Sequence, residues 1–105
     1  MILTTTNSIE GKKIDTYLGV VSGIQYTPTF STKGMTFKEM FSSKKSYEQY
    51  EKLLEDAKEG AFQKLKANAD ALNANAIVGI MVDVETVSSS MYTMVSIVGT
   101  AVIVA

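Results

Sequence analysis

The sequence predicts an α+β domain of two layers, with one long helix packed on a sheet that is mainly antiparallel. Apolar residues recur at every third or fourth position over residues 47–72, which is typical of one face of a helix. The segments on both sides of this stretch alternate or are continuously apolar, as strands do. At 105 residues, the chain is expected to form a single domain, residues 1–105.

Two strands are expected before the helix, over residues 2–5 and 14–24. In the second strand, strict alternation places Gly19 and Gly23 on one face and Leu18 on the other. Glycine weakens a strand interior, so each of these glycines indicates a bulge or the close approach of another backbone.

Residues 26–45 do not give a clear pattern. They include the only proline, three phenylalanines and two methionines, and residues 35–41 could form one or two helical turns. Because linkers seldom expose so many large apolar side chains, we expect an ordered surface segment.

The helix is predicted to begin after Ser46, because Ser46 and Gln49 fit a capping box. Lysines and acidic residues occupy its outer face, which we interpret as solvated. Gly60 is interpreted as a site of close packing. The apolar face consists of Tyr47, Tyr50, Leu54, Ala57, Ala61, Leu65, Ala69 and Leu72.

Residues 73–80 join the helix to the next strand. Asn73 or Asn75 can adopt the left-handed conformation that ends a helix. Alternation over residues 76–85 then places Ile77 and Gly79 on the opposite face from Ala76. We expect Ile77 and Gly79 to face away from the helix, toward a neighbouring subunit.

The last strand, residues 91–104, is mostly apolar on both of its faces. One helix of about 26 residues, roughly 39 Å long, covers only one face of a sheet. A monomer would therefore expose a larger apolar patch than soluble monomers usually tolerate. This predicts a homo-oligomer in which sheets pack face to face or extend edge to edge.

Composition argues against several classes of function. The 10 basic residues are all lysines and are balanced by 11 acidic residues, so there is no basic field for nucleic acid. The chain has neither cysteine nor histidine, which removes thiolate chemistry and the commonest general base. We expect no enzymatic activity, no cofactor and no membrane span, and a cytoplasmic location.

Asp83 and Glu85 are the only clustered candidates for metal ligands. They lie two residues apart, so they share a strand face, and paired carboxylates can hold a hard cation. The alternative is that they are simply solvated near a hairpin end. Metal binding would require an oligomer that brings several copies of the pair together.

Nearly the whole chain outside residues 26–45 resembles the YbjQ-like family of small bacterial proteins, which carries a heavy-metal-binding label. The resemblance implies a β-β-α-β-β subunit, a ring-shaped homopentamer and no known enzymatic activity. The sequence departs from the family at Asn73, where glycine is usual, at Asn75, where aspartate is usual, and at Met81, where an acidic run would begin. The residues that carry the resemblance are Thr4-Thr5-Thr6, Ile9-Glu10-Gly11, Ile14, Tyr17, Gly19-Val20-Val21-Ser22-Gly23, Tyr50-Glu51, Leu54, Ala57-Lys58-Glu59, Ala61-Phe62, Leu65, Ala69, Ala71-Leu72, Ala74-Asn75-Ala76-Ile77-Val78-Gly79-Ile80, Asp83, Glu85-Thr86-Val87, Met94-Val95-Ser96 and Gly99-Thr100-Ala101-Val102.

These observations favour a non-enzymatic, oligomeric scaffold or binding module whose partner is the chain itself. The alternative is weak binding of a metal ion or small ligand at sites between subunits of the ring. A third hypothesis is a partner-binding adaptor that uses the apolar segment 26–45.

Overall fold

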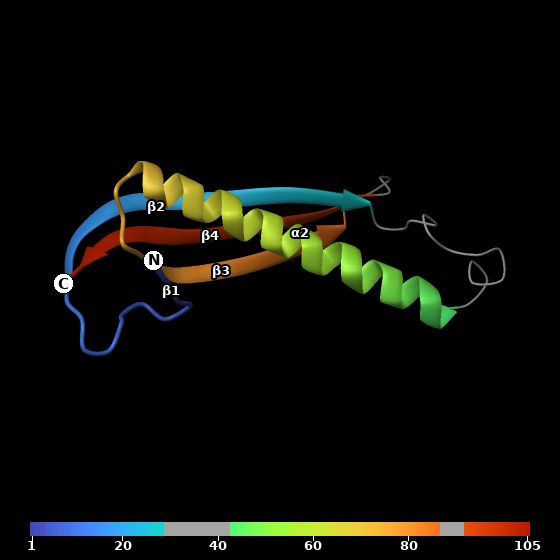
Figure 1. Cartoon of the computed structure of the whole chain (residues 1–105), viewed down its shortest axis with the longest axis horizontal. Coiled ribbons are helices and arrows are strands. Elements are labelled where there is room, and N and C mark those ends of the chain that lie inside the picture. The colour runs from blue at the N-terminus through green and yellow to red at the C-terminus, as the bar shows by residue number, and fades with distance from the viewer. Residues whose placement is uncertain (29–42, 87–91) are drawn as a thin grey trace.

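The computed structural model describes residues 1–28, 43–86 and 92–105. The strands form one mixed sheet in the order β1-β3-β4-β2, and the helix lies across one face of it (Figure 1). β1 pairs with β3 in parallel, whereas β4 is antiparallel to both β3 and β2. The predicted α+β class and the β-β-α-β-β order are confirmed. The elements are β1 (Ile2–Leu3), β2 (Ile14–Pro28), α2 (Ser43–Ala71), β3 (Ala76–Thr86) and β4 (Tyr92–Val104).

The boundaries of the elements differ from the prediction mainly on either side of residues 29–42. β2 continues to Pro28, because its pairing with β4 extends to the Pro28–Tyr92 partners. α2 already includes Ser46, so the predicted cap at that residue is wrong. The helical turns expected over residues 35–41 lie outside the described residues.

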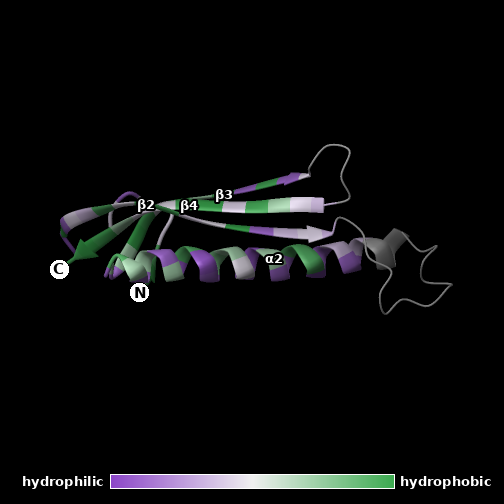
Figure 2. Ribbon diagram, turned by 90° about the horizontal axis from the view of Figure 1, so that it is seen from above, coloured by the Kyte–Doolittle hydropathy of each residue, from purple (hydrophilic) through white to green (hydrophobic). Residues whose placement is uncertain are grey.

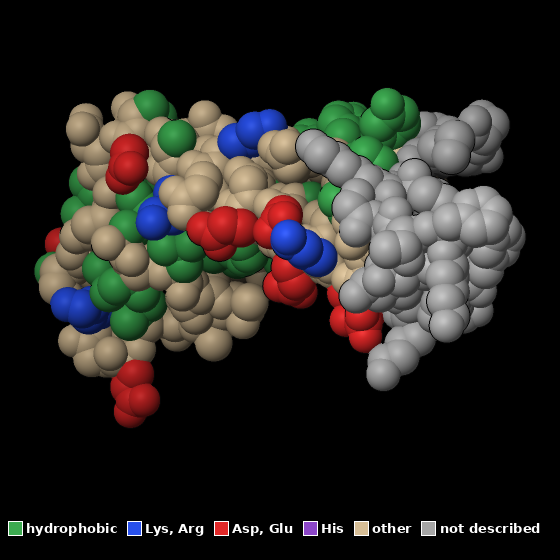
Figure 3. Space-filling model, turned by 45° about the vertical axis from the view of Figure 1, so that its right-hand side comes forward, with side chains coloured by type: hydrophobic (Ala, Val, Ile, Leu, Met, Phe, Trp, Pro, Cys, Tyr) green, Lys and Arg blue, Asp and Glu red, His purple; other side chains and the backbone are tan. Residues whose placement is uncertain are grey.

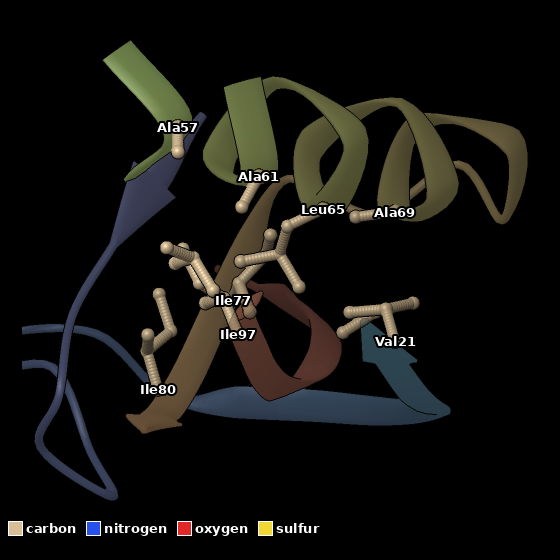
Figure 4. Packing of buried hydrophobic residues seen from close by; sticks show 10 residues of the cluster. Val21, Ala57, Ala61, Leu65, Ala69, Ile77, Ile80 and Ile97 are labelled. Carbon is tan, nitrogen blue, oxygen red and sulfur yellow. The ribbon is translucent and has the colours of Figure 1, made fainter. Parts of the chain in front are cut away.

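The core lies between α2 and the sheet, and small helix residues build one side of it. Ala57, Ala61, Leu65 and Ala69 are buried and face the strands, as the helical spacing predicted (Figure 4). The two ends of the predicted apolar face are exposed, since Tyr47 and Leu72 lie at the surface. The buried helix residues pack against strand residues that include Val21, Ile77, Ile80, Val95, Ile97 and Ala101.

The helix approaches β2 most closely at Gly23. A Cβ added to Gly23 would lie 2.1 Å from the carbonyl oxygen of Ala61 and 2.7 Å from the backbone nitrogen of Leu65. The two backbones therefore touch without an intervening side chain, which confirms one of the two roles predicted for the strand glycines.

Two glycines with positive φ interrupt the strand alternation. Gly19 (φ 135°) lies at a register shift in β2, and Gly79 (φ 62°) lies at one in β3, between Val78 and Met81. Each shift exchanges the faces of the residues that follow, as an inserted residue does in a bulge. Leu18 consequently packs in the helix-side core, on the same side as Val21.

The predicted orientation of Ile77, away from the helix, is wrong, and Gly79 lies at the register shift itself. Ile77 is fully buried under the helix, and Ile80 joins it there after the shift. Ala76 and Val78 lie in the opposite cluster. A substitution at Gly79 would strain the backbone at this positive φ, so it cannot serve as a clean probe of a subunit interface.

The junction between α2 and β3 depends on two asparagines. Asn73 adopts the left-handed conformation (φ 64°), and its amide donates to the carbonyl of Asp70 at 2.9 Å. The Asn75 side chain donates to the carbonyl oxygen of Val104 at 2.9 Å and accepts from the Val104 amide at 2.8 Å. Asn73 thus ends the helix as predicted, while Asn75 is hydrogen-bonded to the backbone at the end of β4.

Among the described residues, the face of the sheet opposite α2 is covered at only one end. There, Ile9 and Ile14 pack against a buried cluster of four residues. No helix covers this face in the part of the chain that the structure describes (Figure 2). Nor does any described helix have the length and apolar character needed to cross a membrane. The four clustered residues are Ala76, Val78, Val102 and Val104.

Replacing Gly23 with alanine is expected to destabilise the domain, because the new methyl group would collide with the helix backbone rather than with a flexible side chain. Overpacking of this kind lowers the free energy of unfolding by about 1–3 kcal/mol. Gly60→Ala is the matched control. Its Cβ would meet only the Gln25 side chain, at 3.3 Å, and alanine is favoured over glycine in a helix by up to about 1 kcal/mol. Urea denaturation of both variants would contradict the packing account if Gly23→Ala were as stable as Gly60→Ala.

Candidate functional site

The uncovered part of the sheet face, hereafter the open face, carries large apolar side chains on three adjacent strands. Val98 on the central strand β4 pairs with Ser22 of β2 on one side and with Met81 of β3 on the other. Val20 and Met81 are 76% and 75% exposed, and both point to this face. The exposed apolar residues of the open face are Val20, Ile24, Tyr26, Met81, Tyr92 and Val98.

The rest of the surface is mixed in charge. Acidic and lysine side chains interleave over the helix side, and hydrophobic side chains gather in separate patches (Figure 3). One ion pair, from Lys58 Nζ to Glu55 Oε1 at 3.2 Å, joins adjacent turns of α2. The open face differs from the helix side in that exposed apolar side chains of three adjacent strands lie on it.

Asp83 and Glu85 lie on the open face near the end of β3. They pair with Ser96 and Met94 of β4, and both are exposed. Their Cα atoms are separated by two residues of strand, which is about 7 Å at 3.3 Å per residue. Within the described ranges, no group of three or more acidic residues, histidines or cysteines could hold a metal ion. One chain therefore presents two carboxylates, fewer ligands than the six to eight oxygens that Ca²⁺ prefers.

A separate hollow lies beside β1, where the chain runs from β1 toward β2. Its volume is about 570 Å³. Hydroxyl groups and one carboxylate line it together with two isoleucines. The lining residues are Ile2, Thr4, Thr6, Ser8, Ile9 and Glu10.

The hollow was not predicted as a site from the sequence. A signal was present, because Thr4, Thr6 and Ser8 alternate as residues on one side of an extended chain do. The short β1 pairing ends at Leu3, so the segment that follows is not a regular strand. Only the structure shows that these residues curve around a common space.

Comparison with known proteins places the whole chain in one family. A family model described as "Putative heavy-metal-binding" matches residues 1–105. A "UPF0145 protein" of Acetivibrio thermocellus is 37% identical over 110 residues, covering 99% of each chain.

A solved structure from Pediococcus pentosaceus supports the fold. That protein, titled a protein of unknown function of the DUF74 family, superposes with a TM-score of 0.60 at 23% identity, covering 100% of this chain and 98% of its own. At this identity, the likeness concerns the fold alone. The family model and the Acetivibrio relative, which both span the whole chain, together show that the protein belongs to the YbjQ-like family.

Proposed function

We propose that the protein is a non-enzymatic, cytoplasmic homo-oligomer that acts as a scaffold or binding module, with the open face buried between subunits. The observation that carries the proposal is the apolar character of this face. Val20, Met81 and Tyr26 expose more than half of their surface there. A soluble monomer seldom leaves such side chains contiguous on three strands, because their burial is favourable at about 25 cal/mol per Å².

The position of Val98 supports a contact at the centre of the open face. β4 lies between β3 and β2, so its side chains on this face have neighbours on both sides. A sheet face that is exposed to water usually carries polar residues. Of Val98 and its two cross-strand partners, Met81 and Ser22, only the serine is polar. Interfaces that hold permanent subunits together are similarly apolar at their centres.

A closed ring of five copies is the size we propose, as the family resemblance implies. Rings arise when one surface of a subunit contacts a different surface of the next and the rotation closes. The non-enzymatic part of the proposal is supported by composition, since the chain has no histidine and no cysteine.

Native mass spectrometry is expected to show an assembly of about 57 kDa, five times the 11.4 kDa of the chain. Val98→Glu is expected to disperse the assembly, because it introduces a charge into a desolvated interface. Val82→Glu is the matched control. Val82 is 44% exposed against 42% for Val98 and occupies a neighbouring strand on the helix side of the sheet.

Two results would count against this proposal. A single 11.4 kDa species at micromolar concentration would show that the open face does not drive assembly. An assembly that tolerates Val98→Glu and is lost in Val82→Glu would place the interface on the other side of the sheet.

A second candidate function is binding of a metal ion between subunits by Asp83 and Glu85. Two observations favour it: the family description names heavy-metal binding, and both carboxylates lie on the face that we assign to the interface. Assembly would bring copies of the pair together and so supply oxygen ligands that one chain lacks.

Calorimetric titration with Mn²⁺ and Zn²⁺ tests this candidate on the assembled protein. Wild-type protein is expected to release or absorb heat in a saturable manner, and the Asp83→Asn, Glu85→Gln double variant is expected to lose that signal. The Glu51→Gln, Asp56→Asn variant removes the same charge from the exposed surface of α2 and should retain it. Equal heats in wild type and both variants would eliminate the proposed pair as ligands.

A further inference from the structure

The hollow beside β1 is held open by the backbone of its own chain. The Thr4 amide donates to the carbonyl of Ile77 at 3.0 Å, and the amides of Gly79 and Ile80 donate to the carbonyls of Thr6 and Thr4 at 2.8 and 3.1 Å. On the far side, Ile9 packs against the buried cluster of the sheet. The segment is therefore fixed at both ends, and the hollow is present before anything binds in it.

The hydrogen bonds of the two threonines leave only acceptors available. Thr6 Oγ1 donates its single proton to the carbonyl oxygen of Ser8 at 2.6 Å. The 2.7 Å contact between the threonine hydroxyls must then use the proton of Thr4. Thr4 Oγ1 also accepts from the Thr6 amide at 3.1 Å. Since a hydroxyl has one proton and two lone pairs, each oxygen retains one free lone pair and no proton.

The Glu10 carboxylate adds a negative charge to these acceptors. It makes no hydrogen bond or ion pair with another residue in the described part of the chain. The residues that line the hollow include no lysine. The Ser8 hydroxyl, which also lines the hollow, can rotate either to donate or to accept. The negative charge and the spare lone pairs of the threonines therefore favour an occupant that carries both donor protons and a positive charge.

From this arrangement we infer that the hollow binds an alkylammonium group, that is, a primary amine in its charged form with an apolar stem. An ammonium carries three donors, which match two hydroxyl lone pairs and a carboxylate. Ile2 and Ile9 supply apolar wall for the methylene stem. A hard metal ion fits less well, because one carboxylate and two hydroxyls provide few ligands beside hydrocarbon.

Two sources can supply this group: a free amine, or a lysine side chain from another copy of the chain. The hollow is formed entirely by residues of one chain, so the inference does not depend on the proposed assembly. If the protein proved to be a monomer, the free amine would remain as the occupant.

The test is a ligand-observed NMR titration of the full chain with n-butylammonium chloride at constant ionic strength. We expect saturable binding, no binding of n-butanol, which lacks the charge, and weaker binding of tetramethylammonium, which lacks donors. Glu10→Gln should weaken the affinity by roughly two- to fivefold, since an exposed charge pair contributes modestly. Thr6→Val should also weaken it, whereas Glu51→Gln, which removes an exposed carboxylate from α2, should not.

Lysine acetylation distinguishes the two sources. If a lysine of another copy fills the hollow, the wild type will not bind n-butylammonium, and one lysine will be acetylated slowly in the wild type and rapidly in Glu10→Gln. Binding of n-butylammonium with no such protected lysine identifies a free amine. The inference is overturned if the wild type neither binds n-butylammonium nor protects a lysine in a Glu10-dependent manner. It is also overturned if the wild type binds n-butylammonium and Glu10→Gln binds it equally well.

Discussion

The contact between the backbones of α2 and β2 at Gly23 determines how the two layers meet. Because no side chain separates Gly23 from Ala61 and Leu65, the helix lies low over β2 and its neighbour β4. The alanines of α2 serve the same purpose, since larger residues would lift the helix from the strands. The helix consequently leaves the outer half of β3 uncovered, and Val82 and Val84 are exposed although they face the helix side.

Much of this fold could be predicted from periodicity, but the strand faces could not. The spacing of Ala57, Ala61 and Leu65 identified the buried helix face correctly because nothing interrupts the 3.6-residue period. The strands contain register shifts at Gly19 and Gly79, where one strand has an extra residue relative to β4 and a glycine with positive φ accommodates it. A sequence shows that a glycine is present, but whether its φ is positive depends on the pairing of the finished sheet.

The two candidate sites differ in whether the sequence could predict them. Asp83 and Glu85 were predicted to share a face because they lie two residues apart. The structure places them together on β3, since both follow the register shift at Gly79. The hydroxyl-lined hollow depends on the course of a short irregular segment and on the parallel pairing of β1 with β3. Such non-local features have no period along the chain that a sequence pattern could reveal.

The Asn75 side chain makes the end of β4 dependent on the junction between helix and strand. Its amide takes the place of a peptide group, bonding both the N–H and the carbonyl of Val104. The terminal residues of a chain usually fray independently. Here Val104 can separate from the sheet only if its two hydrogen bonds to Asn75, which lies two residues after the helix cap Asn73, also break. The end of β4 and the junction between α2 and β3 therefore belong to one cooperative unit of local unfolding.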